Sequence, residues 1–231
     1  MGFLIKADFE HLIPLDELDI IINSDETILN EAMRSSIEEA KSYLRQRYDM
    51  ALSFFDVVDW NMDQNFTTSH IVVLSANQYK NGTNYAIGDL VYYENGSDDV
   101  YICIQAAHNN IPTDTAYWTA IGKNNALYTC IQAAQGQYPN NATYFEQRDD
   151  RNHLLMRLIA NITLYELHSR INPRNIPTFR IERRDDAIKY LTKVADPRNN
   201  IEIDLPLVDH GEQKGLDISY GSSELTNNHT Y

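Results

Sequence analysis

A short sequence pattern recurs after 27 positions in the middle of the chain. Eight residues are identical in the two copies, and Trp118 is matched by Phe145. Two copies are too few to build a solenoid, so the repeat predicts a duplicated hairpin element within one small β module. The identical residues are Tyr101, Cys103, Ile104, Gln105, Ala106, Ala107, Pro112 and Tyr117, which recur as Tyr128, Cys130, Ile131, Gln132, Ala133, Ala134, Pro139 and Tyr144.

The whole segment around this repeat, about residues 66–148, has a composition typical of β structure. Residues 71–74 form a short apolar run that predicts a strand. Residues 89–93 and 100–104 are rich in β-branched and aromatic side chains and flank Asn95-Gly96. Two such runs around Asn-Gly predict a β-hairpin with a somewhat enlarged turn.

The segments on both sides of the β module read as helices. Ser24 is a candidate N-cap, and apolar residues then recur every three or four positions to about Tyr48. Similar patterns predict helices over about 150–170 and from near Glu182 to just before Pro197. Residues 6–12 form a possible short helix that Pro14 would end, and residues 201–205 alternate like a short strand.

The sequence therefore predicts an α+β protein in which a small antiparallel β module is inserted into a helical domain. The discontinuous helical domain is expected over residues 1–60 and 149–206, and the inserted module over residues 61–148. From residue 207 to 231 the chain is polar and has little to bury, so an extended or disordered tail is expected there.

Charge is distributed unevenly along the chain, whose net charge is −14. Residues 1–60 carry 13 acids and 5 bases, whereas residues 151–206 carry 7 acids and 10 bases. An acidic surface repels phosphate, which argues against sequence-independent nucleic-acid binding as the main activity. A chain divided by charge suits a protein whose copies dock side by side.

The sequence has no apolar run long enough for a membrane span and no secretory signal, so a soluble protein made in the cytoplasm is expected.

The sequence gives no positive sign of catalysis. It contains no nucleotide-binding glycine motif, no nucleophile elbow and no His-Glu-x-x-His. We therefore expect no enzymatic activity, no catalytic residues, no cofactor and no metal site, although a missing motif does not exclude a hydrolase. Cys103 and Cys130 occupy the same position of the repeat, and buried free thiols are favoured over a disulfide or a metal pair.

The helical segments, taken together without the insert, resemble the head–tail connector (adaptor) proteins of tailed bacteriophages. The first helix ends in a motif like A-x-x-Y-L-x-x-R-Y, here Ala40 to Tyr48. The later helices are similar over residues 159–170 and 183–195. The resemblance implies a structural virion protein of the neck, at the portal vertex, that forms a homo-oligomeric ring of roughly twelve copies. Such a ring extends the channel of the portal protein and docks the next neck or tail component. DNA would pass through its acidic lumen without specific binding, and no membrane is involved.

The inserted module departs from that family and is similar to small chitin-binding-type carbohydrate modules. The pattern is Tyr85, Gly88, Asp89, Val91, Tyr93, Tyr101, Cys103, His108, Pro112 and Trp118. The resemblance implies that Tyr85, Tyr93 and Trp118 contact a glycan or another partner, because flat aromatic faces stack on sugar rings. The alternative is that these aromatics form the core of a module that is poor in aliphatic residues. The competing function is therefore a carbohydrate-binding adhesin or decoration protein that acts through the insert.

Overall fold

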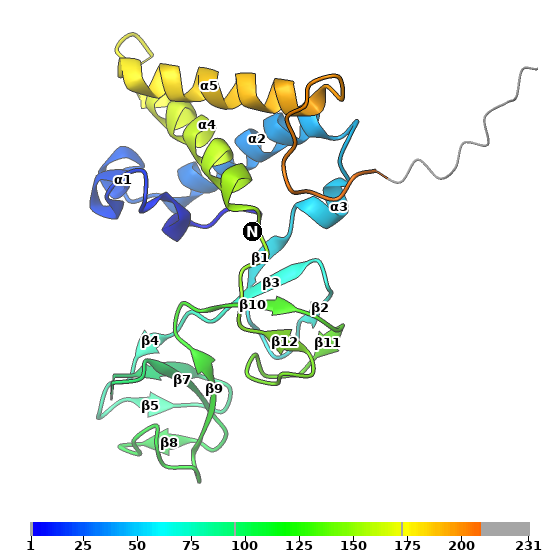
Figure 1. Cartoon of the computed structure of the whole chain (residues 1–231). Helices are drawn as coiled ribbons and strands as arrows, with labels where there is room; N and C mark the ends of the chain where they lie inside the picture. The colour runs from blue at the N-terminus through cyan, green and yellow to red at the C-terminus, as the bar shows by residue number, and fades with distance from the viewer. Residues whose placement is uncertain (1, 95, 172, 209–231) are drawn as a thin grey trace, which may run out of the picture.

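The protein is α+β, as the sequence predicts, with its long helices at one end and its strands at the other (Figure 1). The computed structural model describes residues 2–94, 96–171 and 173–208. Asn95 of the expected Asn-Gly turn, and the expected tail apart from Leu207 and Val208, lie outside the described residues.

Three long helices pack against one another: α2 (Glu26–Leu44), α4 (His153–Ile171) and α5 (Thr178–Ala195). Shorter elements complete this part, namely η1 (Lys6–Phe9), α1 (Leu15–Ile21) and α3 (Met50–Ser53). The apolar stripe of α2 faces α4 and α5, and one hydrophobic core is shared by all these elements. The helices expected from periodicity at about residues 24–48 and 150–170 are thus confirmed in existence.

Several local predictions are wrong in detail. The N-cap of α2 is Asp25, whose carboxylate accepts a hydrogen bond from Thr27 N at 2.9 Å, while Ser24 has φ +56°. η1 ends at Phe9, five residues before Pro14, and Pro14 is instead the N-cap of α1, a helix that periodicity did not reveal. The last helix begins at Thr178 directly after Pro177, not near Glu182. Residues 201–205 form no strand, and the chain there instead leads to a bridge between Leu207 and Tyr48.

The β part contains two four-stranded sheets and two two-stranded sheets. Their orders are β1-β3-β10-β12, β4-β6-β7-β9, β2-β11 and β5-β8. The predicted hairpin is confirmed, since β6 and β7 pair antiparallel with Val91 opposite Tyr101. The strands are β1 (Asp56–Asp59), β2 (Asn65–Phe66), β3 (His70–Val73), β4 (Asn77–Gln78), β5 (Asn84–Tyr85), β6 (Leu90–Tyr93), β7 (Asp99–Cys103), β8 (Ala107–His108), β9 (Trp118–Lys123), β10 (Leu127–Cys130), β11 (Ala134–Gln135) and β12 (Phe145–Glu146).

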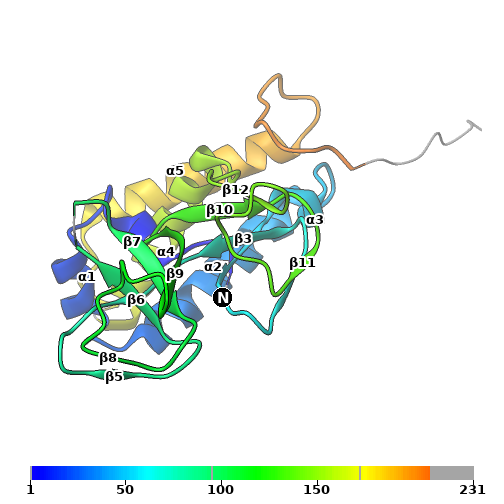
Figure 2. The same cartoon turned by 90° about the horizontal axis from the view of Figure 1, so that it is seen from below.

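These sheets form two units of the same topology, one inserted in the other. The first unit comprises residues 56–74 and 126–146, and the second unit comprises residues 77–123. In each, a parallel strand pair is extended by two antiparallel strands, and a small two-stranded sheet lies beside it. The prediction of a purely antiparallel module is therefore wrong, because the segment that connects each parallel pair carries a short strand that pairs elsewhere, β2 with β11 and β5 with β8. The duplication is therefore larger than the single hairpin element that the repeat predicts. Seen from below, the units lie side by side under the helices (Figure 2).

The register of the strands shows how the units correspond. Val72 pairs with Tyr128 in the first unit, as Val91 pairs with Tyr101 in the second. The later strands thus match at an offset of 27 residues, and the earlier strands match at an offset of 19. A shared core joins the units, because Val100, Ile102 and Ile121 of the second unit pack among buried residues of the first.

Candidate interaction surfaces

The three aromatic residues singled out by the sequence lie together in the second unit, around a fourth. The Tyr79 ring stacks on Tyr85, with centroids 5.5 Å apart and an interplanar angle of 24°. Tyr93 meets Tyr79 edge to face at 5.9 Å, and Trp118 meets Tyr79 at 6.2 Å and Tyr85 at 5.3 Å. Sequence reasoning missed Tyr79, the ring that contacts the other three.

The four rings differ in how much surface they offer to a ligand. Trp118 is only 1% exposed, and its indole N–H donates to Asn110 O at 3.1 Å. Trp118 therefore serves as core, which agrees with the structural alternative for this residue. Tyr79, Tyr85 and Tyr93 are half-buried, so any stacking contact with a ligand falls on the tyrosines.

The hydroxyl groups of the stacked pair are in contrasting environments. Tyr85 Oη accepts a hydrogen bond from Lys80 N at 2.8 Å. Tyr79 Oη is enclosed and has no hydrogen-bond partner within the described residues. Desolvation by burial, together with the charges that Tyr85 and Tyr93 would carry, raises the pKa of Tyr79. An enclosed phenol without a hydrogen-bond partner is destabilising.

The corresponding surface of the first unit is closed. Trp60 and Phe66 occupy the positions of Tyr79 and Tyr85, and both are buried. Tyr138 packs against Trp60 at 5.9 Å, where the second unit has the exposed Ile111. Only the second unit therefore offers a half-open aromatic surface at this position.

The two repeat cysteines are buried free thiols, as the sequence predicts. Cys103 Sγ donates to Gln105 O and Cys130 Sγ donates to Gln132 O, both at 3.0 Å. Desolvation raises the pKa of both thiols. They therefore act as small buried packing residues, and each thiol stabilises the turn that follows it by its hydrogen bond to the carbonyl two residues later.

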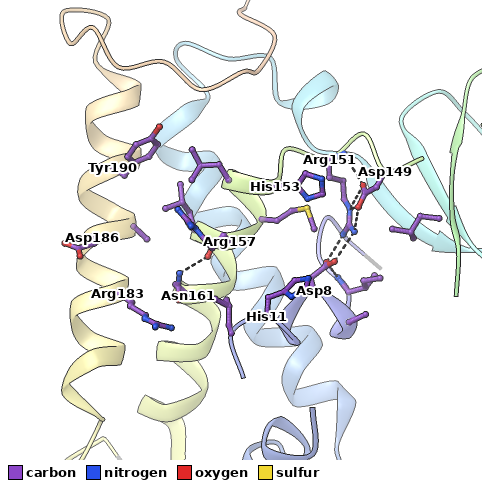
Figure 3. A pocket seen from close by; sticks show the side chains of 18 of the residues that line it. Asp8, His11, Asp149, Arg151, His153, Arg157, Asn161, Arg183, Asp186 and Tyr190 are labelled. Atoms are coloured by element: carbon purple, nitrogen blue, oxygen red, sulfur yellow. Dashed lines mark hydrogen bonds and ion pairs between the residues drawn. The ribbon is translucent and has the colours of Figure 1, made fainter. Parts of the chain in front are cut away.

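A cleft of about 960 Å³ lies where the helices meet the β units (Figure 3). Its walls come from η1, the first half of α4, the middle of α5 and the loop before β10. Its polar lining is mostly cationic or neutral. That lining comprises Asp8, His11, Asn125, Asp149, Arg151, His153, Arg157, Asn161, Arg183, Asp186 and Tyr190.

Arg151 is the structural centre of one wall of this cleft. Its guanidinium donates to Asp8 through Nη1 and Nη2 at 2.7 and 3.0 Å, and to Asp149 through Nε and Nη2 at 2.9 and 2.8 Å. A further bond reaches Phe3 O at 2.8 Å. Burial alone would lower the pKa of Arg151, but the hydrogen bonds from Asp149 and Asp8 raise it above its ordinary value. Arg151 is therefore fully engaged in holding the fold.

The remaining cleft residues do not assemble into a recognisable reactive set. His11, His153 and Asp186 come from three different elements, and Figure 3 draws no interaction among them. Asn161 Nδ2 donates to Arg157 O at 3.0 Å. Among the described residues, no group of three or more His, Cys, Asp or Glu side chains is arranged to hold a metal ion. The cleft therefore combines three arginines and three aspartates with apolar walls.

Comparisons with models of known protein families, with curated protein sequences and with solved structures find no match. None of the helices in the described part of the chain is both long and apolar enough to cross a membrane.

Proposed function

We propose that this chain is a structural subunit of the head–tail connector of a tailed bacteriophage. Copies form a homo-oligomeric ring below the portal protein in the virion neck, extend the DNA channel and dock the next neck or tail component. The β units are an insertion into the helical connector bundle that forms the ring. The proposal involves no catalytic step and no cofactor.

The observation that carries the proposal is that the sequence segments resembling the connector family pack into one helical body. α2 and α4 are separated by more than 100 residues of sequence, yet Ser36 Oγ donates to Glu166 Oε2 at 3.1 Å. Arg184 of α5 pairs with Glu39 of α2 at 3.4 Å. A helical framework assembled from the segments on both sides of the insert is what the resemblance leads one to expect.

The A-x-x-Y-L-x-x-R-Y motif has a clear role in this framework. Ala40, Leu44 and Tyr48 are buried in the helical core. The Arg47 guanidinium lies 5.4 Å from the centre of the Tyr48 ring, donates to Val194 O at the end of α5 at 2.8 Å and pairs with Glu202 at 2.7 Å. The motif thus fastens the end of α2 to the end of α5, which supports reading it as part of a family framework rather than as a chance match.

The charge distribution suits assembly into a ring around DNA. Residues 1–60 carry an excess of acids and residues 151–206 an excess of bases, which would favour docking between copies through surfaces of opposite charge. The overall charge of −14 would keep a channel wall from adhering to DNA phosphates.

The test is the absolute mass of the purified chain, alone and after mixing with the portal protein encoded in the same genome. Negative-stain images of any large species should show rings, free or seated on the portal. A measured mass of 26.6 kDa, that of one chain, under both conditions would contradict the proposal. A variant lacking residues 77–123 is not a suitable control, because those residues contribute to the core of the first unit.

A second candidate function is carbohydrate binding through the β insert, in an adhesin or decoration protein. The specific observation in its favour is the stacked, half-buried Tyr79–Tyr85 pair. The parts of these rings that remain accessible could stack on a sugar ring.

This second function is tested on a glycan array and on immobilised chitin oligosaccharides. Tyr79→Ala and Tyr85→Ala should each abolish retention if the sugar stacks there. Tyr138→Ala, at the aromatic position of the closed first unit, is the matched control and should leave retention unchanged. Wild-type protein that binds no glycan would leave the tyrosines with a packing role only.

A further inference from the structure

Arg180, in the first turn of α5, is a buried cation whose hydrogen-bonding groups are left unsatisfied. The residue is 4% exposed, and its Nε and Nη1 atoms are enclosed without a partner within the described residues. The Phe179 ring lies 4.7 Å from the guanidinium carbon. Desolvation and the nearby Arg183 lower the pKa of Arg180, and the charge of Glu17 only partly opposes them. Buried guanidinium groups are normally paired, so this one lacks a partner that the described residues of a single copy do not supply.

The surface around Arg180 has apolar side chains that a single copy leaves in water. Ile171, Phe179 and Ile181 are all exposed, at the end of α4 and the start of α5. We call this surface, Ile171 and residues 179–181, the Arg180 end. It lies at the left of Figure 1, where α4 turns into α5. A contact surface with apolar groups around one desolvated arginine is typical of a protein interface.

A complementary surface lies at the other end of α5. Leu52 and Leu207 are exposed there, and the Tyr48–Leu207 bridge and the Arg47 bond to Val194 O hold them near the C-terminus of α5. Asp204 is exposed on the same segment, and its carboxylate has no ion pair or hydrogen bond within the described residues. We call this surface, Leu52, Asp204 and Leu207, the Asp204 end. The 18 residues of α5 place the two ends roughly 27 Å apart.

We propose that the Arg180 end of one copy packs against the Asp204 end of the next copy, and that the Asp204 carboxylate supplies the partner that Arg180 lacks. The two surfaces differ in charge and lie at opposite ends of one helix, so the contact is head-to-tail. Repetition of a head-to-tail contact generates a ring when the rotation closes. This inference rests on the proposed connector function and names the surfaces through which the ring would form.

The first test replaces Arg180 with methionine, which keeps the length of the side chain and removes its charge. In the isolated subunit the unsatisfied guanidinium disappears, so Arg180→Met should raise Tm. In the assembly the ion pair is lost, so self-association should weaken by roughly 30-fold or more. Lys189→Met, on an exposed part of the same helix, is the control and should change neither quantity. Unchanged self-association of Arg180→Met, measured by sedimentation over a range of concentrations, would overturn the inference.

The second test exchanges the two charges. Arg180→Glu and Asp204→Arg should each prevent assembly, and the double variant should restore it. Because the two positions are too far apart to meet within one subunit, rescue reports contact between copies. A folded double variant that assembles no better than either single variant would overturn the inference. If Arg180→Glu does not fold, as circular dichroism would show, the methionine variant decides.

The outcomes separate this inference from the function on which it rests. A wild-type chain that forms no ring, alone or on the portal, contradicts the connector function. Rings that form equally well from wild-type protein, Arg180→Met and Asp204→Arg leave the connector function standing and overturn only the assignment of the two ends.

Discussion

The carboxylate of Asp8 and the guanidinium of Arg151 form a bidentate ion pair, with N···O distances of 2.7 and 3.0 Å. The residues are 143 positions apart, and both side chains are almost completely enclosed. Asp8 belongs to η1, and Arg151 follows the last strand of the β units and precedes α4. The pair therefore joins the start of the chain to the point where the chain returns from the insert.

Arg151→Ala should strongly destabilise the protein. Removing the cation leaves Asp8 and Asp149 as buried or partly buried carboxylates without their partner, which costs about 3–5 kcal/mol of unfolding free energy. Urea denaturation followed by circular dichroism measures the loss. The matched control is Arg148→Ala, three positions away, whose side chain is 47% exposed and pairs with Glu146 and Asp150. Its loss should be no more than about 1 kcal/mol, and equal losses for the two variants would refute the structural role of Arg151.

Gly122→Ala should weaken the contact between the two β units. A Cβ at this position would lie 2.5 Å from Leu74 Cδ1 and 2.6 Å from Tyr128 Oη, both in the first unit. Overpacking of this kind costs about 1–3 kcal/mol in addition to the cost of the positive φ. Gly82→Ala is the control, because Gly82 also has a positive φ but nothing lies within 4 Å of its Cβ position. If thermal denaturation gave the same Tm for Gly122→Ala and Gly82→Ala, the interface between the units would accommodate the added methyl group at little cost.

Periodicity predicts the three long helices, places the start of one of them late and does not reveal the short α1. α2 has a regular buried face, and its existence follows from the sequence. The first turn of α5 carries the exposed Phe179 and Ile181, which break the pattern, so the predicted start was four residues late. α1 is short and directly follows Pro14, which was read only as the end of the preceding helix.

The duplication of the β unit was visible in the sequence only in part. The later strands share eight identical residues at an offset of 27, whereas the earlier segments 60–74 and 79–93 share only Asn65/Asn84 and Val72/Val91. Packing of aromatic rings tolerates Trp, Tyr and Phe at the same position, so the structural equivalence of Trp60 with Tyr79 leaves no identity to find. For the same reason sequence reasoning missed Tyr79, although Tyr85, Tyr93 and Trp118 all contact its ring.

Cys103 and Cys130 should react slowly with a thiol reagent in the native protein. Both are buried, and burial raises their pKa above the ordinary value of a thiol, so the reactive thiolate is scarce near neutral pH. Because the folded pKa is raised, the protein loses stability as pH rises above the pKa of the unfolded thiols. Two equivalents of reagent should be consumed promptly in denaturant and far fewer without it. Fast labelling of the native chain would contradict the buried positions.

The two tryptophans provide one fluorescent reporter in each β unit. Trp60 donates to Gln137 O in the first unit, and Trp118 donates to Asn110 O in the second, at carbonyls that correspond at the 27-residue offset. The chain has no other tryptophan, so Trp118→Phe leaves a reporter of the first unit and Trp60→Phe leaves a reporter of the second. Each substitution removes the indole donor from a partly buried hydrogen bond and should cost about 1 kcal/mol.

These two variants test whether the units unfold together. Val100, Ile102 and Ile121 of the second unit pack in the core of the first, so unfolding one unit would expose apolar surface of the other. Adding Gly122→Ala to each single-tryptophan variant should therefore lower the urea midpoint reported by Trp60 and by Trp118 to the same extent. Gly82→Ala, added in the same way, should lower both midpoints by a smaller and again equal amount. A shift seen only by Trp118, which lies in the same unit as Gly122, would mean that the second unit unfolds independently and that the shared core contributes little.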